Sequence, residues 1–491
     1  MQQADKERVE LLINKGFQYH QDGHLDDAEP LYEEALKLDD NNARLYNLIG
    51  VLKLQQSDPD TAIEYMMKAI NLSKSEYYYE TLFHAFIKKK DYNRIISYET
   101  TVNMLFPKCF SLMFNLGLAY RKLFKFKEAL YYYERALRIN PMSYEGWNNV
   151  AVIYRIQGRA EDASYAMKVC YDLSPDDNTA YYLGIDYMSA KQYDKGLPLF
   201  EKRLSKEIAF TSQNKTHPQK IRKDNEWKGE DIKDKDIFIY YEAGFGDLIM
   251  FSRYLPLVAK KCRKLTLMCQ KPLTPLFKEN KHLGIDTIID SFDPKIELDA
   301  DVHASILSLP YLLGLKDDNV FETPEGYIVP NMDMVEEYKK KYFQNDKIKV
   351  GIKWRGNTTL EKNRVIPAEL FNRLTYVDNT QFYSFQTFEG SEDVNKIQNI
   401  IDIGKDLTDF AQTAAALRNL DLVICNDTSL AHLAGAMRIP CWIILPYNYD
   451  WRWHTDLKHC DWYESVKLFR SAQIGDWQSA FDQVLEEMTP D

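Results

Sequence analysis

A period of 34 residues runs through the first 205 residues of this 491-residue chain. Gly16 and Gly50 stand 34 residues apart, and each is followed by alanines at offsets 12 and 19 and by a large residue at offset 16. The same register continues from Gly117, Ala151 and Gly184. A fixed period of this length predicts an array of similar units in place of a single globular core.

The spacing resembles the tetratricopeptide repeat, a helix–turn–helix unit of about 34 residues. Six units cover roughly residues 9–205, and the third, around His84, is degenerate. Small residues at offsets 0 and 12 would let the two helices of a unit approach closely, beside large residues at offsets 3 and 16. Pro141 and Pro175 follow the second helix of their units, where proline ends a helix.

Repeat arrays of this kind have a concave face that holds an extended peptide or another protein. We therefore expect residues 1–205 to recruit a partner, with a spacer or a dimerisation surface as the alternative. The same residues hold 21 of the 33 tyrosines. The runs Tyr77–Tyr79 and Tyr131–Tyr133 cannot be wholly buried, because consecutive helical residues point in different directions.

The remainder of the chain predicts an α/β fold. Residues 206–235 are polar and indicate a connector, in which Trp227 is expected to dock on one domain. Short apolar runs then alternate with helical stretches, which is typical of parallel sheets wound with helices. The expected strands are 237–242, 265–269, 287–290, 349–354, 382–386, 422–426 and 441–445. The predicted domains are a first half at 236–335, a second half at 345–475 and a C-terminal helix within 476–491 that could pack on either half.

Composition excludes several classes of function. The chain carries a net charge of −11, divided as −3 up to residue 205 and −8 beyond it, so a nucleic-acid partner is disfavoured. No apolar run approaches the ~20 residues of a membrane span, and the first residues show no secretory signal. Seven cysteines without CxxC spacing indicate reduced thiols and no zinc cage. We expect a cytoplasmic protein.

A glycine loop follows the first expected strand of the α/β region. Gly244 and Gly246 permit a tight turn, and Asp247 stands at or near the start of the next helix. The spacing is GxGD, so a dinucleotide site of the GxGxxG type is poorly supported. The Asp247 carboxylate could accept a proton from an attacking hydroxyl, or it could cap the helix.

Residues 422–446 have the pattern of a strand–helix–strand unit. Asp427, Thr428 and Ser429 fall at the turn into the helix, where free N–H groups and the helix dipole favour a phosphate. His432 lies one turn further along and could serve the same site or pack between helix and sheet.

A cationic loop follows the strand expected at 349–354. It holds Lys353, Arg355 and Arg364, with Asn357 and Lys362 between them. Cations on a loop after a strand suit an anionic ligand, and a solvated loop is the alternative.

Two further features carry weaker predictions. The triplet at 299–301 has DxD spacing, which is frequent by chance, so we expect no metal there. Trp451 and Trp453 could stack on a base or sugar, or pack structurally.

Seven ordered segments together resemble a known enzyme family. They are EAGFGDLIMFSRYLP, SLPYLLG, GIKWRGN…NRVIP, FYSFQ, DLTDFAQTAA, NDTSLAHLAGA and LPYNYDWRW. They resemble the glycosyltransferase domain that many bacteria fuse to tetratricopeptide repeats, which is similar to lipopolysaccharide heptosyltransferases of the GT-B fold. The plan is also similar to O-linked N-acetylglucosamine transferase. The resemblance implies a repeat α-solenoid followed by two Rossmann-like halves, and a metal-independent, inverting transfer from a nucleotide-sugar without a cofactor.

The resemblance also implies roles for particular residues. Asp247 corresponds to the proposed catalytic base, and Arg364 stands where heptosyltransferases carry a phosphate-binding lysine. The segment Asp427, Thr428, Ser429 and His432 matches the DTxxxH pattern at the donor phosphates and sugar, with Ser429 in place of the usual glycine. Further expected donor contacts are Lys353, Arg355 and Gln386.

Three functions remain open at this point. The first is transfer to a protein recruited by the repeats, such as bacterial flagellin or another surface protein. The second is a lipid- or polysaccharide-directed transferase, and the third is a scaffold without activity. The sequence identifies neither the sugar, the nucleotide nor the oligomeric state, although a homo-oligomer is possible.

Overall fold

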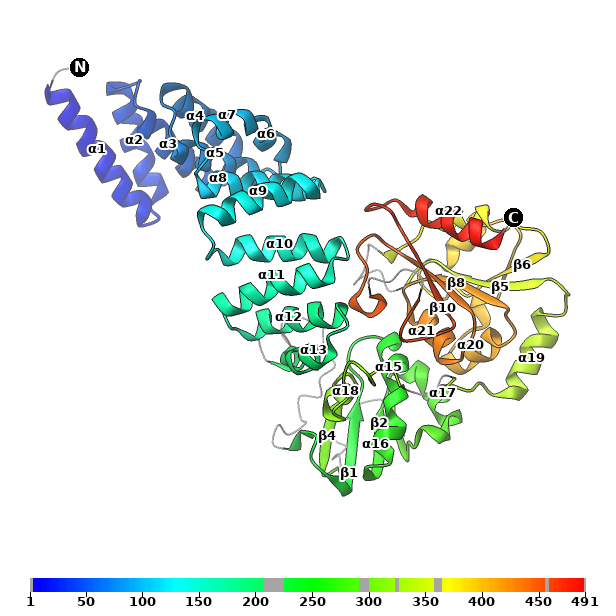
Figure 1. Cartoon of the computed structure of the whole chain (residues 1–491). Coiled ribbons are helices and arrows are strands. Elements are labelled where there is room, and N and C mark those ends of the chain that lie inside the picture. Colours follow the sequence, from blue (N-terminus) through cyan, green and yellow to red (C-terminus); the bar gives the residue numbers. More distant parts are fainter. Residues whose placement is uncertain are drawn as a thin grey trace. The chain divides into compact units, whose positions relative to one another are not determined.

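The computed structural model describes residues 3–205, 225–290, 300–322, 326–356, 364–454 and 459–489. The chain divides into two compact units, Met1–Ile153 and Tyr154–Asp491. The first unit consists of repeat helices, and the second combines the last repeat helices with two parallel sheets (Figure 1). No helix in these described ranges is long and apolar enough to cross a membrane.

Residues 3–205 form the six predicted helix pairs. In the third pair the second helix is broken at Tyr98, in the unit whose sequence is degenerate. The helices are α1 Gln3–Gln21, α2 Leu25–Leu38, α3 Ala43–Gln55, α4 Pro59–Leu72, α5 Glu76–Lys88, α6 Tyr92–Ser97, α7 Glu99–Leu105, α8 Phe110–Lys122, α9 Phe126–Ile139, α10 Tyr144–Ile156, α11 Ala160–Leu173, α12 Asp177–Ser189 and α13 Tyr193–Phe200.

Glycine at offset 0 brings the two helices of a repeat into contact with the large residue at offset 16. A Cβ at Gly16 would lie 2.8 Å from the Tyr32 ring, and one at Gly117 would lie 2.9 Å from the Tyr133 ring. Real Cβ atoms do not come this close, so the repeat requires glycine at these two positions. The contact predicted from the period is confirmed.

The two tyrosine runs are partly buried, as expected. Tyr79, Tyr132 and Tyr133 are buried in the core, whereas Tyr77 is 53% and Tyr131 is 55% exposed. Burial raises the pKa of Tyr133 to about 12. The tyrosine excess therefore reflects mainly the packing of the repeats.

The first sheet contains four parallel strands in the order β3-β2-β1-β4. Trp227 is buried against this half, and its backbone N–H donates to the His303 carbonyl, as its expected docking requires. The first strand begins inside the segment predicted as a connector, because Ile232 already pairs with Cys262. The elements are β1 Ile232–Tyr240, α15 Phe245–Phe251, α16 Leu255–Ala259, β2 Cys262–Met268, α17 Thr274–Glu279, β3 Thr287–Ile289, β4 Val302–Ser305 and α18 Leu309–Leu312.

The second sheet contains six parallel strands in the order β10-β9-β8-β5-β6-β7. Numbered from its own first strand this is the doubly wound order 3-2-1-4-5-6. Phe481 of the last helix packs on Phe371 at 5.0 Å between ring centroids, so the C-terminal helix covers the second half. The elements are α19 Met332–Tyr342, β5 Ile348–Lys353, β6 Thr380–Ser384, β7 Ile400–Asp402, α20 Phe410–Leu417, β8 Leu422–Asn426, α21 Ser429–Ala436, β9 Cys441–Leu445, β10 Val466–Arg470 and α22 Trp477–Met488.

Each sheet has a point where the order of its strands reverses. It lies between β1 and β4 in the first sheet and between β5 and β8 in the second. In open parallel sheets, ligands bind in the crevice outside the carboxyl ends of the strands at this point. The glycine loop follows β1, and the cationic loop and the Asp427 turn follow β5 and β8, so all three predicted segments lie at such reversals.

The last repeats are built into the α/β unit. Arg203, after α13, donates through Nε to both oxygens of the buried Glu242 carboxylate at 3.1 and 3.2 Å. Tyr193 in α13 is hydrogen-bonded to His454 Nε2 at 2.7 Å. Residue 205 thus marks the change from repeats to sheets, whereas the boundary between compact units lies near residue 153.

Candidate functional site

The glycine loop places Asp247 in the first turn of α15. Gly244 donates its N–H to Asp247 Oδ2 at 2.9 Å, so the carboxylate does cap the loop. The residue before, Ala243, has a φ of 66°, in the left-handed region that costs a residue with a side chain roughly 1 kcal/mol. The Gly244 contact therefore uses one oxygen of the Asp247 carboxylate and leaves Oδ1 for another partner.

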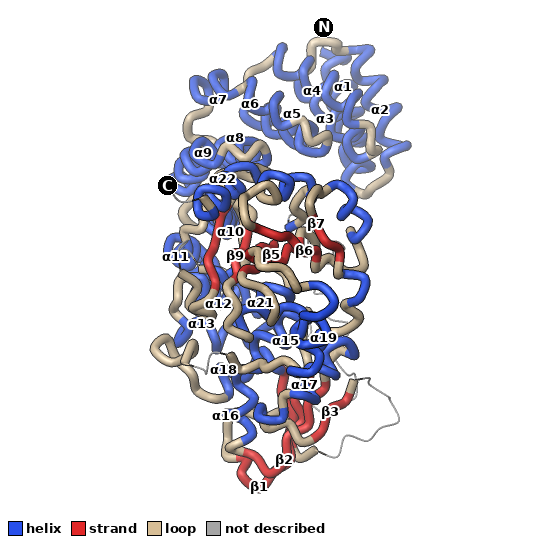
Figure 2. The backbone as a smooth tube through the Cα atoms, turned by 90° about the vertical axis from the view of Figure 1, so that its right-hand side faces the viewer, coloured by secondary structure: helices blue, strands red, loops and turns tan. Residues whose placement is uncertain are grey.

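Gly246 lets the two halves meet. A Cβ there would lie 2.7 Å from His432 Cδ2 and 3.4 Å from Ser429 Cα, both in α21. The two helices lie side by side between the sheets in both views of the molecule (Figure 2). The close approach brings Asp247 of the first half next to the Asp427–His432 segment of the second.

A chain of alternating charges joins the two halves. Arg452 donates to Asp247 Oδ1 through one Nη and to Asp450 Oδ1 at 2.7 Å through the other. Arg364 continues the chain, with Nη1 at 2.7 Å from Asp427 Oδ2 and Nη2 at 3.4 Å from Asp450 Oδ2. The order is thus Asp247–Arg452–Asp450–Arg364–Asp427.

Burial and pairing set the ionisation of this chain. Burial raises the pKa of Asp427, against the opposing effect of Arg364. Burial would also raise the pKa of Asp450, but Arg452 and Arg364 outweigh it and hold that pKa below its ordinary value. Burial acts to lower the pKa of Arg452, yet Asp247 and Asp450 raise it. The Arg452 guanidinium therefore stays charged.

Lys353 ends β5, pairs in the sheet with Cys425 of β8 and is partly buried. Its Nζ reaches the Thr387 hydroxyl at 3.5 Å, and within the described part of the chain it has no carboxylate partner. Burial lowers its pKa to about 8, so the amine is mainly charged at neutral pH. A buried ammonium group of this kind favours an anionic ligand.

The turn into α21 also offers unused polar groups. Thr428 occupies the N-cap position but makes no side-chain cap, and its Oγ1 is buried without a hydrogen bond to any described residue. Ser429 follows at the first helical position. The hydroxyls and N–H groups of this turn are the groups a phosphate would need.

Gln386 binds the backbone of neighbouring loops, whereas the Arg355 guanidinium lies near a carboxylate. The Gln386 amide accepts from the N–H of Arg355 at 3.0 Å and donates to the carbonyls of Arg355 and Glu389 at 3.1 and 2.8 Å. Its side chain thus orders the two loops, and direct contact with a donor stays a prediction. The Arg355 guanidinium lies 4.0 Å from Asp393, and its Nε is buried without a partner in the described residues.

His432 is buried at the contact between the halves. It stacks on Trp453 at 5.1 Å between centroids, and its Nδ1 is hydrogen-bonded to the Tyr463 hydroxyl at 3.1 Å. Burial, aided by Arg452, lowers its pKa to about 3, so the imidazole is neutral. His432 therefore serves packing, and its contact with a donor remains a prediction.

The remaining candidates take no part in this chain of charges. Asp301 accepts from the Asp236 N–H at 2.7 Å and lies 3.5 Å from Arg263. Trp451 and Trp453 are buried, which favours the structural alternative for both. Asp299, Asn357 and Lys362 lie outside the described residues.

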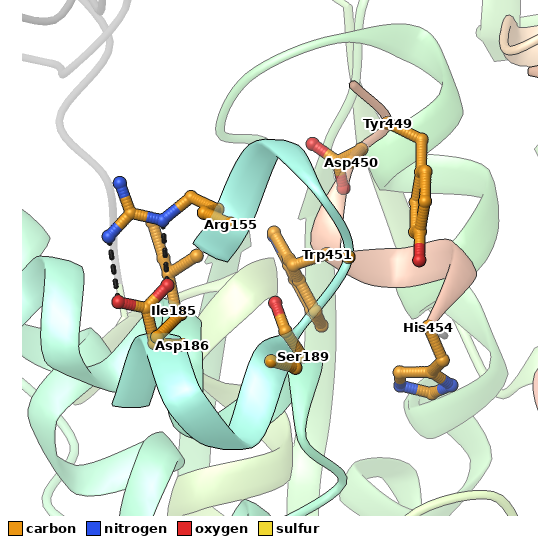
Figure 3. A pocket seen from close by; sticks show the side chains of 11 residues that line it. Arg155, Ile185, Asp186, Ser189, Tyr449, Asp450, Trp451 and His454 are labelled. Carbon is orange, nitrogen blue, oxygen red and sulfur yellow. Dashed lines mark hydrogen bonds and ion pairs between the residues drawn. The ribbon is translucent and has the colours of Figure 1, made fainter. Parts of the chain in front are cut away.

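A small pocket of ≈ 50 Å³, partly open to solvent, lies beside this chain of charges. One wall comes from repeat helices and the other from residues 449–454 (Figure 3). On the repeat wall Arg155 forms a bidentate pair with Asp186, with both N–O distances 2.7 Å. Asp450 lines the opposite wall, so the pocket and the chain of charges share a residue.

Three buried charged residues of this region, Arg452, Asp450 and Glu242, were not predicted from the sequence. Arg452 and Asp450 lie in YDWRW, a segment whose tryptophans alone drew attention. Their pattern, an acid and a base one residue apart beside two tryptophans, could have indicated the site. Charged side chains buried among aromatic residues are stable only when they are paired.

Comparison with known proteins identifies the N-terminal repeats. Models of the tetratricopeptide repeat match residues 9–42, 43–76 and 111–143. Protein FlbA of Caulobacter vibrioides is 24% identical over 75% of this chain and 71% of its own length. The UDP-N-acetylglucosamine–peptide N-acetylglucosaminyltransferase of Giardia intestinalis is 25% identical over 185 residues. These residues are 37% of this chain and 10% of that enzyme.

A solved structure also aligns with about half of the chain. It is the glycosyl transferase family 9 protein of Veillonella parvula, with a TM-score of 0.39 and 13% identity, covering 49% of this chain and 87% of that one. The protein joins N-terminal tetratricopeptide repeats to two parallel Rossmann-like sheets.

Proposed function

We propose that the chain is a glycosyltransferase that moves a sugar from a nucleotide-sugar to a hydroxyl of a protein recruited by the repeats. The observation that carries the proposal is that α15 and α21 bring Asp247 beside the turn after β8, while the neighbouring strand β5 ends on a partly buried lysine without a described counter-ion. This arrangement offers one carboxylate for a proton and several groups for phosphate oxygens. A cytoplasmic location, where nucleotide-sugars are made, belongs to the same proposal.

The reaction is a direct displacement. The acceptor oxygen forms a bond to the anomeric carbon while the bond from that carbon to the phosphate oxygen breaks. Asp247 takes the hydroxyl proton, and Lys353, Arg364 and the first turn of α21 stabilise the charge of the leaving phosphate. Attack from the face opposite the leaving group inverts the anomeric centre.

The protein acceptor is supported by the way the repeats enter the site. Arg203 and Tyr193 fasten the last repeat to both halves, and Arg155 and Asp186 form a wall of the pocket that Asp450 also lines. A polypeptide bound beside Arg155 and Asp186 would therefore lie next to Asp450. Flagellin or another surface protein is the acceptor we propose, while a lipid or polysaccharide acceptor gives these repeats no task in recognition.

A panel of nucleotide-sugars tests the enzyme assignment. A donor that binds the native state should raise its thermal midpoint, and the same donor should release its nucleotide during turnover. Asp247→Asn should retain donor binding and lose turnover by about 10²-fold or more. The matched control is Asp301→Asn, which removes an ion-paired carboxylate from the same half. Full turnover by Asp247→Asn would refute the assignment of the base.

The acceptor is tested in cells that produce the full chain. Mass spectrometry should find a sugar on a surface protein in cells with the wild type, and should not find it in cells with Asp247→Asn. Sugar appearing only on lipid or polysaccharide would contradict the protein acceptor and leave the transferase assignment standing.

A further inference from the structure

We propose that Arg452 changes its partner during the reaction. Before the donor binds, it holds Asp247, and when the donor arrives, the guanidinium moves to a phosphate oxygen and leaves Asp247 Oδ1 to the acceptor hydroxyl. Arg452 is then the positioning residue that makes the base available only after the donor is in place. The inference rests on the proposed function and deepens it.

The hydrogen bonds of Asp247 support this exchange. Oδ2 accepts from the Gly244 N–H at 2.9 Å, whereas Oδ1 accepts from Arg452. If Arg452 leaves, the Gly244 bond still fixes the carboxylate, and Oδ1 becomes free to accept a proton. The Gly244 contact therefore orients the Asp247 carboxylate, and the Arg452 contact blocks the oxygen that would accept the proton.

Contacts with Asp450 and Trp451 would hold Arg452 in the site while its guanidinium changes partner. Its own N–H donates to Asp450 Oδ1 at 3.1 Å, its Nη1 donates to the same atom at 2.7 Å, and its guanidinium lies 4.6 Å from the Trp451 ring centroid. Its Nε is buried and makes no hydrogen bond to a described residue. The side chain thus has an unused donor and needs to give up only its bond to Asp247.

The charge balance favours a partner change of this kind. Three carboxylates, on Asp247, Asp450 and Asp427, share the guanidiniums of Arg452 and Arg364. A diphosphate adds negative charge to a group that already has an excess of it, and Lys353 supplies only one positive charge to balance it. Because buried anions need paired cations, a phosphate oxygen draws a guanidinium away from a carboxylate, and Arg452 is the arginine paired with Asp247 of the first half.

A double-mutant cycle on pyrophosphate affinity tests the exchange without using turnover. Inorganic pyrophosphate is titrated calorimetrically into the full-length wild type, Asp247→Asn, Arg452→Gln and the double variant. Asp247→Asn should tighten pyrophosphate binding by roughly fivefold or more, because Arg452 no longer has to leave a carboxylate. In the Arg452→Gln background the same substitution should change the affinity by less than about twofold.

Controls keep the cycle interpretable. Arg373→Gln removes a partly exposed arginine of the second half that pairs with Asp482 at 2.6 Å, and it should leave pyrophosphate affinity unchanged. Arg452→Lys keeps the charge, and it replaces Arg452→Gln in the cycle if the latter fails to fold. It should retain part of the affinity gain seen with Asp247→Asn.

Two outcomes would overturn the exchange. An equal gain from Asp247→Asn in both backgrounds would mean simple repulsion through space, and no gain at all would mean that Asp247 does not compete for Arg452. If pyrophosphate binds neither the wild type nor Asp247→Asn, the phosphate site is wrong as well. If pyrophosphate binds but the effects of Asp247→Asn and Arg452→Gln are independent, only the exchange is refuted. The proposed function is then still tested by the panel of nucleotide-sugars.

Discussion

Replacing Gly246 with alanine should weaken the contact between α15 and α21. The new Cβ would lie 2.7 Å from His432 Cδ2, whereas carbon atoms pack best at about 3.5–4.0 Å. One of the two helices would therefore have to move by roughly 1 Å. His432 cannot yield easily, since it is stacked on Trp453 and hydrogen-bonded to Tyr463.

The cost of this overpacking should be about 1–3 kcal/mol. Gly244→Ala provides the matched control in the same loop. Gly244 has a φ of −88°, which alanine adopts freely, and its Cβ would meet only Asp247 Oδ2 at 3.4 Å. This substitution should cost less than about 0.5 kcal/mol.

Hydrogen exchange and urea denaturation of the full chain measure the difference. In Gly246→Ala the amides of α15 and α21 should exchange faster and the unfolding midpoint should fall, while Gly244→Ala should resemble the wild type. Nucleotide release should decline in Gly246→Ala, because Asp247 moves with its helix. If Gly246→Ala matches the wild type in exchange and stability, the close approach of the two halves is wrong.

Two further predictions concern pH. Since burial lowers the pKa of Lys353 to about 8, the affinity for a nucleoside diphosphate should fall as pH rises through 8, approaching tenfold per pH unit above it. Lys353→Met should bind more weakly and without this dependence in calorimetric titrations, and an identical pH profile in both proteins would contradict the assignment. Since burial lowers the pKa of His432 to about 3, the unfolded chain takes up a proton at this residue near pH 6.5 that the folded chain does not. Stability should therefore fall as pH drops below 6.5, by roughly 2 kcal/mol at pH 5, and urea midpoints at pH 7 and pH 5 should show a smaller loss in His432→Gln.

The repeats could be predicted from sequence because each one repeats the same local contact. Gly16 and Tyr32 lie in neighbouring helices of one unit, and their spacing recurs along the chain. The break at Tyr98 could not be foreseen in detail, because a degenerate unit gives no register to compare. The packing of the last repeat on both sheets depends on single long-range pairs such as Tyr193 with His454, which leave no pattern in the sequence.

The strands that sequence reasoning missed share one property. β4, β7 and β10 all lie at an edge of their sheet. Edge strands are short or carry exposed charges, which protect them against pairing with another chain. The sequence VKLFR of β10, with an exposed lysine, is an example. Central strands such as β8 are buried on both faces and stand out as continuous apolar runs.

The individual loops of the site could be predicted from the sequence, but their meeting in space could not. The turns that hold Asp247 and Asp427 are local features, so their residue types and positions indicated them. Arg452 could not be assigned in this way, because it pairs with Asp247 across 205 residues of sequence. Only the fold shows that the two loops and the YDWRW segment meet.

A crystal structure of the full chain with the nucleoside diphosphate selected by the donor panel would show where the donor binds. We expect the phosphates at the carboxyl ends of β5 and β8, within hydrogen-bonding distance of Lys353 Nζ and the first turn of α21. We also expect the nucleotide on the second half, with the sugar side open towards Asp247. A nucleotide bound at the ends of β1 and β4, or elsewhere on the chain, would contradict the proposed donor site.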